Sequence, residues 1–152
     1  FKCFSNEYVA GLFDGEGCVT LERSWENGKY ERYRHYQLRL KITSTYLPIL
    51  LLLKQWASTG TIHQKKGKKE KCFKPCYDWY VYGKESLIKV ISRIKPHVVI
   101  KEKQLRLAEQ FITTIRKVGG KVPLGAEAQE IRKNIYYRLK SLYKGVEILP
   151  SE

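Results

Sequence analysis

The chain has 152 residues, the length of a single domain, and 43% of them are hydrophobic, which excludes a disordered tail. Lys and Arg number 29 against 15 Asp and Glu, and the net charge of +14 indicates a polyanionic partner, either DNA or RNA. The apolar run from Tyr46 to Trp56 is too short to cross a membrane and contains Lys54, so no membrane partner is expected.

The compartment is predicted from the first residues and from the cysteines. The chain start lacks the apolar stretch and cleavage site of a secretory signal, so we expect an intracellular location, in the cytoplasm or nucleoid or in an organelle. No second cysteine pair stands at zinc-finger spacing, which favours ordinary packing thiols over a zinc site. The four cysteines are Cys3, Cys18, Cys72 and Cys76.

The first part of the chain predicts a helix and then a strand. Ser5 or Asn6 caps the helix, which is expected to end at about Phe13 because glycines follow at positions 15 and 17. Residues 18–26 alternate between apolar and polar side chains, as in a half-buried strand. The dipeptide at positions 27–28, Asn-Gly, then predicts a hairpin turn.

The next segment predicts the second strand and a second helix. From Gln37 to Ile42 every other residue is apolar and is expected to face the core. Thr45 is expected to cap a helix that runs through Pro48 to about Ser58, with Gly60 closing it.

The remaining elements complete an α+β plan. Two strands and three helices are predicted over residues 61–66, 73–82, 83–95, 101–117 and 126–144. A lysine-rich tip joins the two strands, and Gly119-Gly120 ends the fourth helix. We therefore expect one domain over residues 1–152, with a four-stranded antiparallel sheet covered by helices, a core from about 5 to 117 and a C-terminal helix from about 126 to 144.

The polar face of this sheet carries side chains suited to DNA. Arg, Lys and Gln hydrogen-bond to purine edges, and a β-ribbon fits the major groove. An ordinary solvated sheet face is the alternative. The candidate base contacts are Thr20, Glu22, Ser24, Gln37, Arg39, Lys41, His63, Lys65, Asp78 and Tyr80. The candidate phosphate contacts are Lys66, Lys68, Lys69, Arg132, Lys133, Arg138 and Lys140.

The segment from Val9 to Gly17 contradicts local helix rules. Asp14 and Glu16 stand at a helix C-terminus, where the helix dipole disfavours each negative charge by roughly 0.3–1 kcal/mol. Carbonyl groups also lack partners there, and carboxylates beside carbonyl oxygens are the ligands that Mg²⁺ prefers. The segment therefore predicts either a Mg²⁺ site or a glycine-rich turn with exposed acids. Ala10, Gly11 and Gly15 leave one helix face nearly bare, so a second helix could approach closely.

Residues 9–17, with the sequence VAGLFDGEG, resemble the LAGLIDADG motif of homing endonucleases, and the predicted αββαββα order is similar to that family's. The resemblance implies a saddle-shaped antiparallel sheet with extra C-terminal helices, and a single-motif DNA endonuclease encoded by a group I intron. It implies that Glu16 binds catalytic Mg²⁺ or Mn²⁺ with the carbonyl of Gly15. It also implies that the motif helices of two copies pack together through Ala10, Gly11 and Asp14.

A second segment resembles a family stretch that carries an active-site lysine, and Lys101 falls at that position, with Lys103 as a substitute. Such a lysine would stabilise a pentacovalent phosphate or orient the attacking water. The family often places Gln and Arg after the second strand, whereas Ser44 and Pro48 stand there in this chain. Either neighbours such as Lys41 replace them, or catalysis is weaker, or the alignment slips by a few residues.

The single motif also predicts the assembly. One acidic site cuts one strand, so cleavage of a duplex calls for a homodimer. The resemblance implies Mg-dependent hydrolysis across the minor groove of a long pseudo-palindromic double-stranded DNA site, leaving 3′ overhangs. The alternatives are a maturase that binds intron RNA, a non-catalytic DNA-binding regulator and a basic ribosomal protein. Retention of Glu16 and Lys101 favours the nuclease.

Overall fold

The computed structural model describes residues 3–25, 34–66, 74–116 and 125–145, and confirms the predicted α+β class. Its four strands form one antiparallel sheet in the order β1-β2-β4-β3. The strands are β1 (Gly17–Trp25), β2 (Arg34–Ser44), β3 (Thr61–Gln64) and β4 (Tyr77–Val81). The helices are α1 (Asn6–Glu16), α2 (Leu47–Ala57), α3 (Lys84–Ile94), the short 3-10 helix η1 (Lys95–His97), α4 (Glu102–Ile112) and α5 (Ala126–Tyr143).

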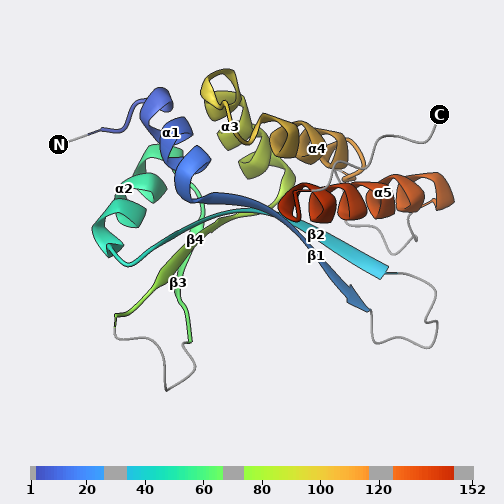
Figure 1. Cartoon of the computed structure of the whole chain (residues 1–152), viewed down its shortest axis with the longest axis horizontal. Helices are drawn as coiled ribbons and strands as arrows, with labels where there is room; N and C mark the ends of the chain where they lie inside the picture. Colours follow the sequence, from blue (N-terminus) through green and yellow to red (C-terminus); the bar gives the residue numbers. More distant parts are fainter. Residues whose placement is uncertain (1–2, 26–33, 67–73, 117–124, 146–152) are drawn as a thin grey trace.

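All helices lie on one side of the sheet, and the two strand pairs diverge from its centre as an arch that opens away from them (Figure 1). The register follows the alternation of the sequence, because neighbouring residues of a strand point to opposite faces. Val19 pairs with Leu40 on the helix side, whereas Glu22 pairs with Gln37 on the open side. The sheet therefore has an apolar face closed by helices and a polar face left uncovered.

The core lies between the sheet and the helices. The strands contribute buried apolar side chains such as Leu40 and Trp79, and the helices add Leu53, Ile91 and Leu105. Periodic apolar residues on the amphipathic helices account for this packing.

A polar clasp joins the first three helices. The Asn6 side-chain oxygen accepts hydrogen bonds from the Trp56 indole at 3.2 Å and from Nε of Arg93 at 3.3 Å. The Arg93 guanidinium also lies 4.0 Å from the centre of the Trp56 ring and donates to the Trp56 carbonyl at 2.7 Å. These contacts fix α1, which carries the acidic segment, against α2 and α3.

The first helix extends beyond its predicted end. Ser5 is its N-cap, as predicted, and accepts a hydrogen bond from the amide of Tyr8 at 3.1 Å. The helix does not stop at Phe13, since it continues through Gly15 to Glu16. A glycine within a helix costs only about 1 kcal/mol, which tertiary contacts at the helix end can offset.

The predicted caps of the second helix were wrong at both ends. Tyr46, not Thr45, is the N-cap residue of α2, and it has no side-chain cap, while its amide donates to the Ser44 hydroxyl at 3.0 Å. At the other end the C-cap is Ser58, in the left-handed conformation with φ 53°, and Gly60, with φ 99°, lies two residues beyond it. A short polar side chain tolerates that conformation better than most residues do.

Some predictions fall outside the described residues: the turn at residues 27–28, the lysines at 68 and 69, Cys72, and the glycines at 119 and 120. No helix within the described ranges is long and apolar enough to cross a membrane. Cys3, Cys18 and Cys76 are free thiols.

Candidate active site

Glu16 is the last residue of α1, and its side chain is exposed. Its carboxylate has no hydrogen bond or ion pair with the part of the chain that the structure describes. Glu16 borders a hollow of about 340 Å³ beside the end of β2, which also contains Ser44 from the predicted pocket. The full lining is Leu12, Glu16, Ile42, Thr43, Ser44, Thr45, Ile49 and Cys76. The carboxylate is therefore available to an external ligand.

Lys101 places its amine at the same helix end. The ammonium group donates to the carbonyl of Phe13 at 3.1 Å and to the carbonyl of Gly17. The helix predicted over residues 101–117 begins at this lysine, and a positive charge is unfavourable at a helix N-terminus. Its backbone does stand at the N-cap of α4, but its charge lies at the C-terminus of α1, which favours a cation.

Asp14 has a role that the sequence did not predict. Its carboxylate accepts hydrogen bonds from the backbone amides of Val99 at 2.9 Å, Ile100 at 3.1 Å and Lys101 at 3.0 Å. These amides precede α4, so the carboxylate caps that helix from within the same chain. The prediction that Asp14 belongs to a dimer interface did not anticipate this use of its carboxylate.

Two other lysines of the predicted pocket lie elsewhere. Lys41 is on the polar face of the sheet, paired with Cys18 on β1 and with Tyr80 on β4. Lys103 is exposed on the first turn of α4. Neither lines the hollow beside Glu16, so Lys101 and Ser44 are the predicted partners that the fold brings to the end of α1.

The oxygen atoms at the end of α1, from the Glu16 carboxylate and the last helix carbonyls, suit a hard divalent cation that also binds substrate. Within the described ranges no cluster of three or more His, Cys, Asp or Glu side chains is able to hold a metal ion. Mg²⁺ does not need such a cluster, because proteins commonly bind it through one or two carboxylates together with substrate phosphates. The unpaired Glu16 carboxylate and the terminal helix carbonyls fit that pattern.

The polar face of the sheet is ordered around Arg39. Its guanidinium donates to Glu22 at 3.3 Å and to Gln37 at 2.8 Å, and lies 5.5 Å from the centre of the Tyr80 ring. Thr20 lies beside it and donates to the Arg39 carbonyl at 3.3 Å. The strand register puts the predicted base contacts of β1, β2 and β4 on this one face, as predicted.

Asp78 departs from its predicted role as a base contact. Only 3% of the residue is exposed. Its carboxylate accepts hydrogen bonds from the hydroxyls of Thr43 and Tyr80, the latter at 3.1 Å. Lys65 pairs with it at 3.6 Å. Burial and the neighbouring Asp78 charge raise the pKa of the Tyr80 hydroxyl. Asp78 therefore holds its neighbours in place and is not itself presented to a base.

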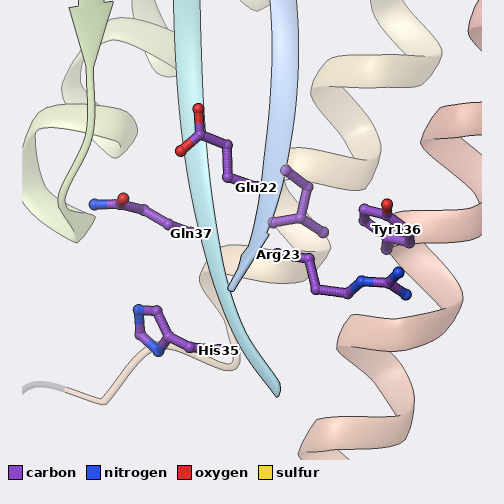
Figure 2. A pocket seen from close by; sticks show the side chains of 6 residues that line it. Glu22, Arg23, His35, Gln37 and Tyr136 are labelled. Atoms are coloured by element: carbon purple, nitrogen blue, oxygen red, sulfur yellow. The ribbon is translucent and has the colours of Figure 1, made fainter. Parts of the chain in front are cut away.

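The far end of the β1–β2 pair forms a second hollow, of about 430 Å³ (Figure 2). Glu22, Gln37 and His35 extend from one side of the strand pair, whereas Arg23 extends from the other side toward α5. The Arg23 guanidinium lies 4.7 Å from the centre of the Tyr136 ring, and the Lys140 amine lies at the same distance from that ring. Basic side chains thus flank the edge of the polar face.

The predicted phosphate contacts differ in their availability. Lys66, Lys133, Arg138 and Lys140 are exposed. Arg132 is engaged with its own chain, since it donates to the Thr114 hydroxyl at 2.8 Å and lies 4.8 Å from the Phe111 ring centre. Burial and the nearby Arg116 lower its pKa. The side chain of Ser24, a predicted base contact, lies outside the described set.

One face of α1 is bare. A Cβ atom built at Gly11 or at Gly15 would meet nothing within 4 Å, and Tyr8 on the same face is 49% exposed. Ala10 was predicted to share this face but is fully buried in the core of its own chain. Tyr8, Gly11 and Gly15 are three and four residues apart, so they lie on the same face of the helix. Ala10 does not follow this spacing and lies on another face.

Comparison with known proteins identifies the family. A profile of the LAGLIDADG endonuclease family matches residues 9–112, more than half of the chain. The chain belongs to the LAGLIDADG endonuclease family. Comparison with curated protein sequences finds no significant match.

Solved LAGLIDADG structures share the fold at low identity. The homing endonuclease I-TnaI is 16% identical, with a TM-score of 0.71, over 95% of this chain and 99% of its own. I-CvuI, solved with uncleaved I-CreI target DNA in the presence of magnesium, is 18% identical with a TM-score of 0.63 over 89% and 94%. I-AabMI, bound to uncleaved DNA, is 18% identical with a TM-score of 0.69 over 96% and 51%. The first two relatives therefore match the chain along nearly their full length, and the third along half of its length.

Proposed function

We propose that the protein is a homodimeric, divalent-metal-dependent endonuclease that cuts both strands of a long, approximately palindromic DNA site. Glu16 carries this proposal, because its carboxylate is exposed, unpaired among the described residues and placed at the end of the bare helix. Its place in the segment that resembles the family motif, within the matched residues 9–112, supports a role for this carboxylate in DNA cleavage.

Glu16 and the carbonyl of Gly15 would hold Mg²⁺ or Mn²⁺ together with phosphate oxygens of the DNA. A bound divalent ion would supply the Lewis-acid chemistry that phosphodiester hydrolysis uses. Within the described residues, backbone carbonyls engage two of the three ammonium hydrogens of Lys101, and the third would be directed to a negatively charged phosphate. Such a fixed positive charge would stabilise the transition state of cleavage.

The bare face of α1 supports the dimer. Two helices with glycines at positions 11 and 15 can approach closely across a two-fold axis, and this would bring both Glu16 side chains near the centre of the site. Exposed apolar side chains on other elements would add to the surface if the dimer covers them: Leu51 on α2 is 54% exposed, and Val99 and Ile100, whose amides bond to Asp14 of α1, are 80% and 72% exposed.

The lengths of the relatives also support two copies. This chain matches 99% of I-TnaI but only 51% of I-AabMI, which was solved bound to uncleaved DNA. One I-AabMI chain is therefore long enough for two units of this fold. A homodimer would give this shorter chain the same number of units.

The uncovered face of the sheet would read bases in the major groove on each side of the cleavage centre. Arg39 and Gln37 provide the donors and acceptors, and Lys66 with the exposed cations of α5 would contact phosphates. The cuts would cross the minor groove and leave 3′ overhangs. Maturation of a group I intron RNA is less well supported, because RNA binding requires neither the Glu16 carboxylate nor the amine of Lys101.

The test is cleavage by Glu16→Gln. A duplex that the natural protein cuts is first recovered from a randomised library in the presence of Mg²⁺. Glu16→Gln should bind this duplex with unchanged affinity but should not cut it, since the amide keeps the shape and loses the charge. Cleavage by the variant at the natural rate would refute the site.

The control is Glu102→Gln, an exposed acid in the first turn of α4. It should leave cleavage unchanged. If both variants lost activity equally, a general loss of negative charge would explain the result and not a specific role of Glu16.

A further inference from the structure

The last residue of α5, Tyr143, contacts the strand that follows Glu16. The Tyr143 hydroxyl accepts a hydrogen bond from the amide of Val19 at 2.9 Å and donates to the carbonyl of the same residue. It also accepts a hydrogen bond from the thiol of Cys18 at 3.3 Å. A single side chain thus engages both backbone groups of one strand residue.

This contact occupies an otherwise open sheet edge. β1 is an edge strand, because the sheet order is β1-β2-β4-β3. Every second residue of an edge strand turns its amide and carbonyl away from the sheet, where they lack a strand partner. The Tyr143 hydroxyl takes the place of that partner at Val19.

The hydroxyl is well suited to remain a donor. About half of Tyr143 is exposed, but its hydroxyl end lies against β1. Burial, and next the contact with the Cys18 thiol, raises the pKa of the Tyr143 hydroxyl well above its usual range. A raised pKa favours the neutral hydroxyl, which keeps its proton for the hydrogen bond to the strand.

Together with Lys101, Tyr143 restrains the backbone near Glu16. The Lys101 amine holds the carbonyl of Phe13 before Glu16 and that of Gly17 directly after it. Tyr143 holds Val19, three residues after Glu16. No loop separates α1 from β1, so the two contacts restrain the backbone on which the carboxylate stands.

We infer that Tyr143 is a positioning residue for DNA cleavage, which fixes the start of β1 so that Glu16 is presented to the metal in one place. The inference rests on the proposed role of Glu16 as a metal ligand. Protection of the sheet edge alone would be a purely structural role, and it predicts no change in the metal requirement.

The experiment compares Tyr143→Phe with the natural protein in a Mg²⁺ titration of cleavage, with the duplex recovered by selection as substrate. Loss of a net hydrogen bond should raise the Mg²⁺ concentration for half-maximal cleavage by roughly two- to tenfold. The maximal rate at saturating Mg²⁺ should return to that of the natural protein. The affinity for the duplex in EDTA should not change, since the hydroxyl does not face the polar face of the sheet.

Two variants serve as matched controls. Tyr82→Phe removes a hydroxyl from another tyrosine that is also 47% exposed, and it should leave the titration unchanged. Cys18→Ala removes only the thiol contact and should change it far less than Tyr143→Phe does.

An unchanged Mg²⁺ requirement in Tyr143→Phe would overturn the inference, as would a loss of duplex affinity in EDTA by the same factor. A rate that stays low at saturating Mg²⁺ would also overturn it. Hydrogen exchange of the natural protein gives a test that needs no variant, since exchange of the Val19 amide at the rate of an unbonded edge amide would exclude the contact. Persistent cleavage by Glu16→Gln would refute the proposed function itself, a result distinct from all of these.

Discussion

Asp14 and Lys101 cap each other's helices. Asp14, near the C-terminus of α1, accepts three backbone hydrogen bonds at the start of α4, and Lys101, at the start of α4, donates to two carbonyls at the end of α1. Each charge opposes the dipole of its own helix and is favourable at the end of the other. The exchange lets the acidic motif remain at a helix C-terminus and leaves Glu16 free for a ligand.

The first prediction concerns this exchange. Asp14→Ala should lower the free energy of unfolding by about 1–2 kcal/mol, because the amides of Val99, Ile100 and Lys101 lose their acceptor. Urea denaturation measures the effect. Glu102→Ala is the control, since Glu102 is an exposed acid nearby whose partner among the described residues is Arg106, at 2.7 Å, and its loss should cost at most about 0.5 kcal/mol. Equal losses in the two variants would contradict the capping role.

The second prediction concerns the junction between α1 and β1. A Cβ atom at Gly17 would overlap the Phe13 ring and lie 2.6 Å from the Phe13 carbonyl. Phe13 is buried and cannot yield, so Gly17→Ala should cost about 1–3 kcal/mol of stability. At Gly15 a Cβ would meet nothing within 4 Å in its own chain, so at protein concentrations too low for self-association Gly15→Ala should gain up to about 1 kcal/mol from helix propensity. Melting curves of the two variants that shift in the same direction would contradict this account.

The periodicity of the sequence predicted the sheet. Alternation in residues 18–26 and 37–42 anticipated which residues of β1 and β2 face the helices, because side chains of a strand point alternately to its two faces. The motif likewise predicted an acid at the end of the first helix, and Glu16 stands there exposed. Sequence patterns were sufficient to predict these features because they depend on the geometry of a single strand or helix.

Contacts between distant segments were not predictable in this way. Ala10 and Gly11 are both small, and only the packing of α1 distinguishes the buried one from the exposed one. Asp78 looked like other polar residues of its face, yet the neighbouring strands bury it. The link from Tyr143 to Val19 spans 124 positions, and no sequence pattern indicates it.

The third prediction concerns Asp78. Asp78→Ala should cost about 2–3 kcal/mol, because Thr43 and Tyr80 lose a shared acceptor and Lys65 loses its counter-ion within a nearly buried cluster. Tyr80→Phe removes one of these hydrogen bonds and should cost about 1 kcal/mol. The measurement is urea denaturation monitored by tryptophan fluorescence. A neutral Asp78→Ala would mean that the carboxylate does not organise its neighbours.

The fourth prediction compares substitutions on the exposed and the buried face of α1. Gly11→Leu adds a side chain in open space and should leave the isolated chain folded, but should weaken self-association at least tenfold by separating the paired helices. Sedimentation equilibrium measures the association. Ala10→Leu places the same side chain in the core, and its expected effect is a loss of about 1–3 kcal/mol of stability. A Gly11→Leu protein that associates like the natural chain would place the dimer contact elsewhere.

The fifth prediction distinguishes base reading from phosphate contact. Arg39 is held on the polar face by Glu22 and Gln37, which orients its guanidinium toward one position of a bound duplex. Arg39→Ala should therefore relax discrimination at particular base pairs, with a cost of roughly 1–3 kcal/mol on the preferred site only.

Lys66→Ala is the matched variant, because Lys66 is exposed beyond β3 and would meet the DNA backbone. It should weaken binding to every duplex by a similar factor and reduce the slope of log affinity against log salt by about one, since one fewer counter-ion is released. Arg39→Lys keeps the charge but lacks the planar fork, so it should leave the salt slope unchanged without recovering the discrimination. If Arg39→Ala and Lys66→Ala lowered affinity equally for all sequences, the sheet would bind the backbone without reading bases.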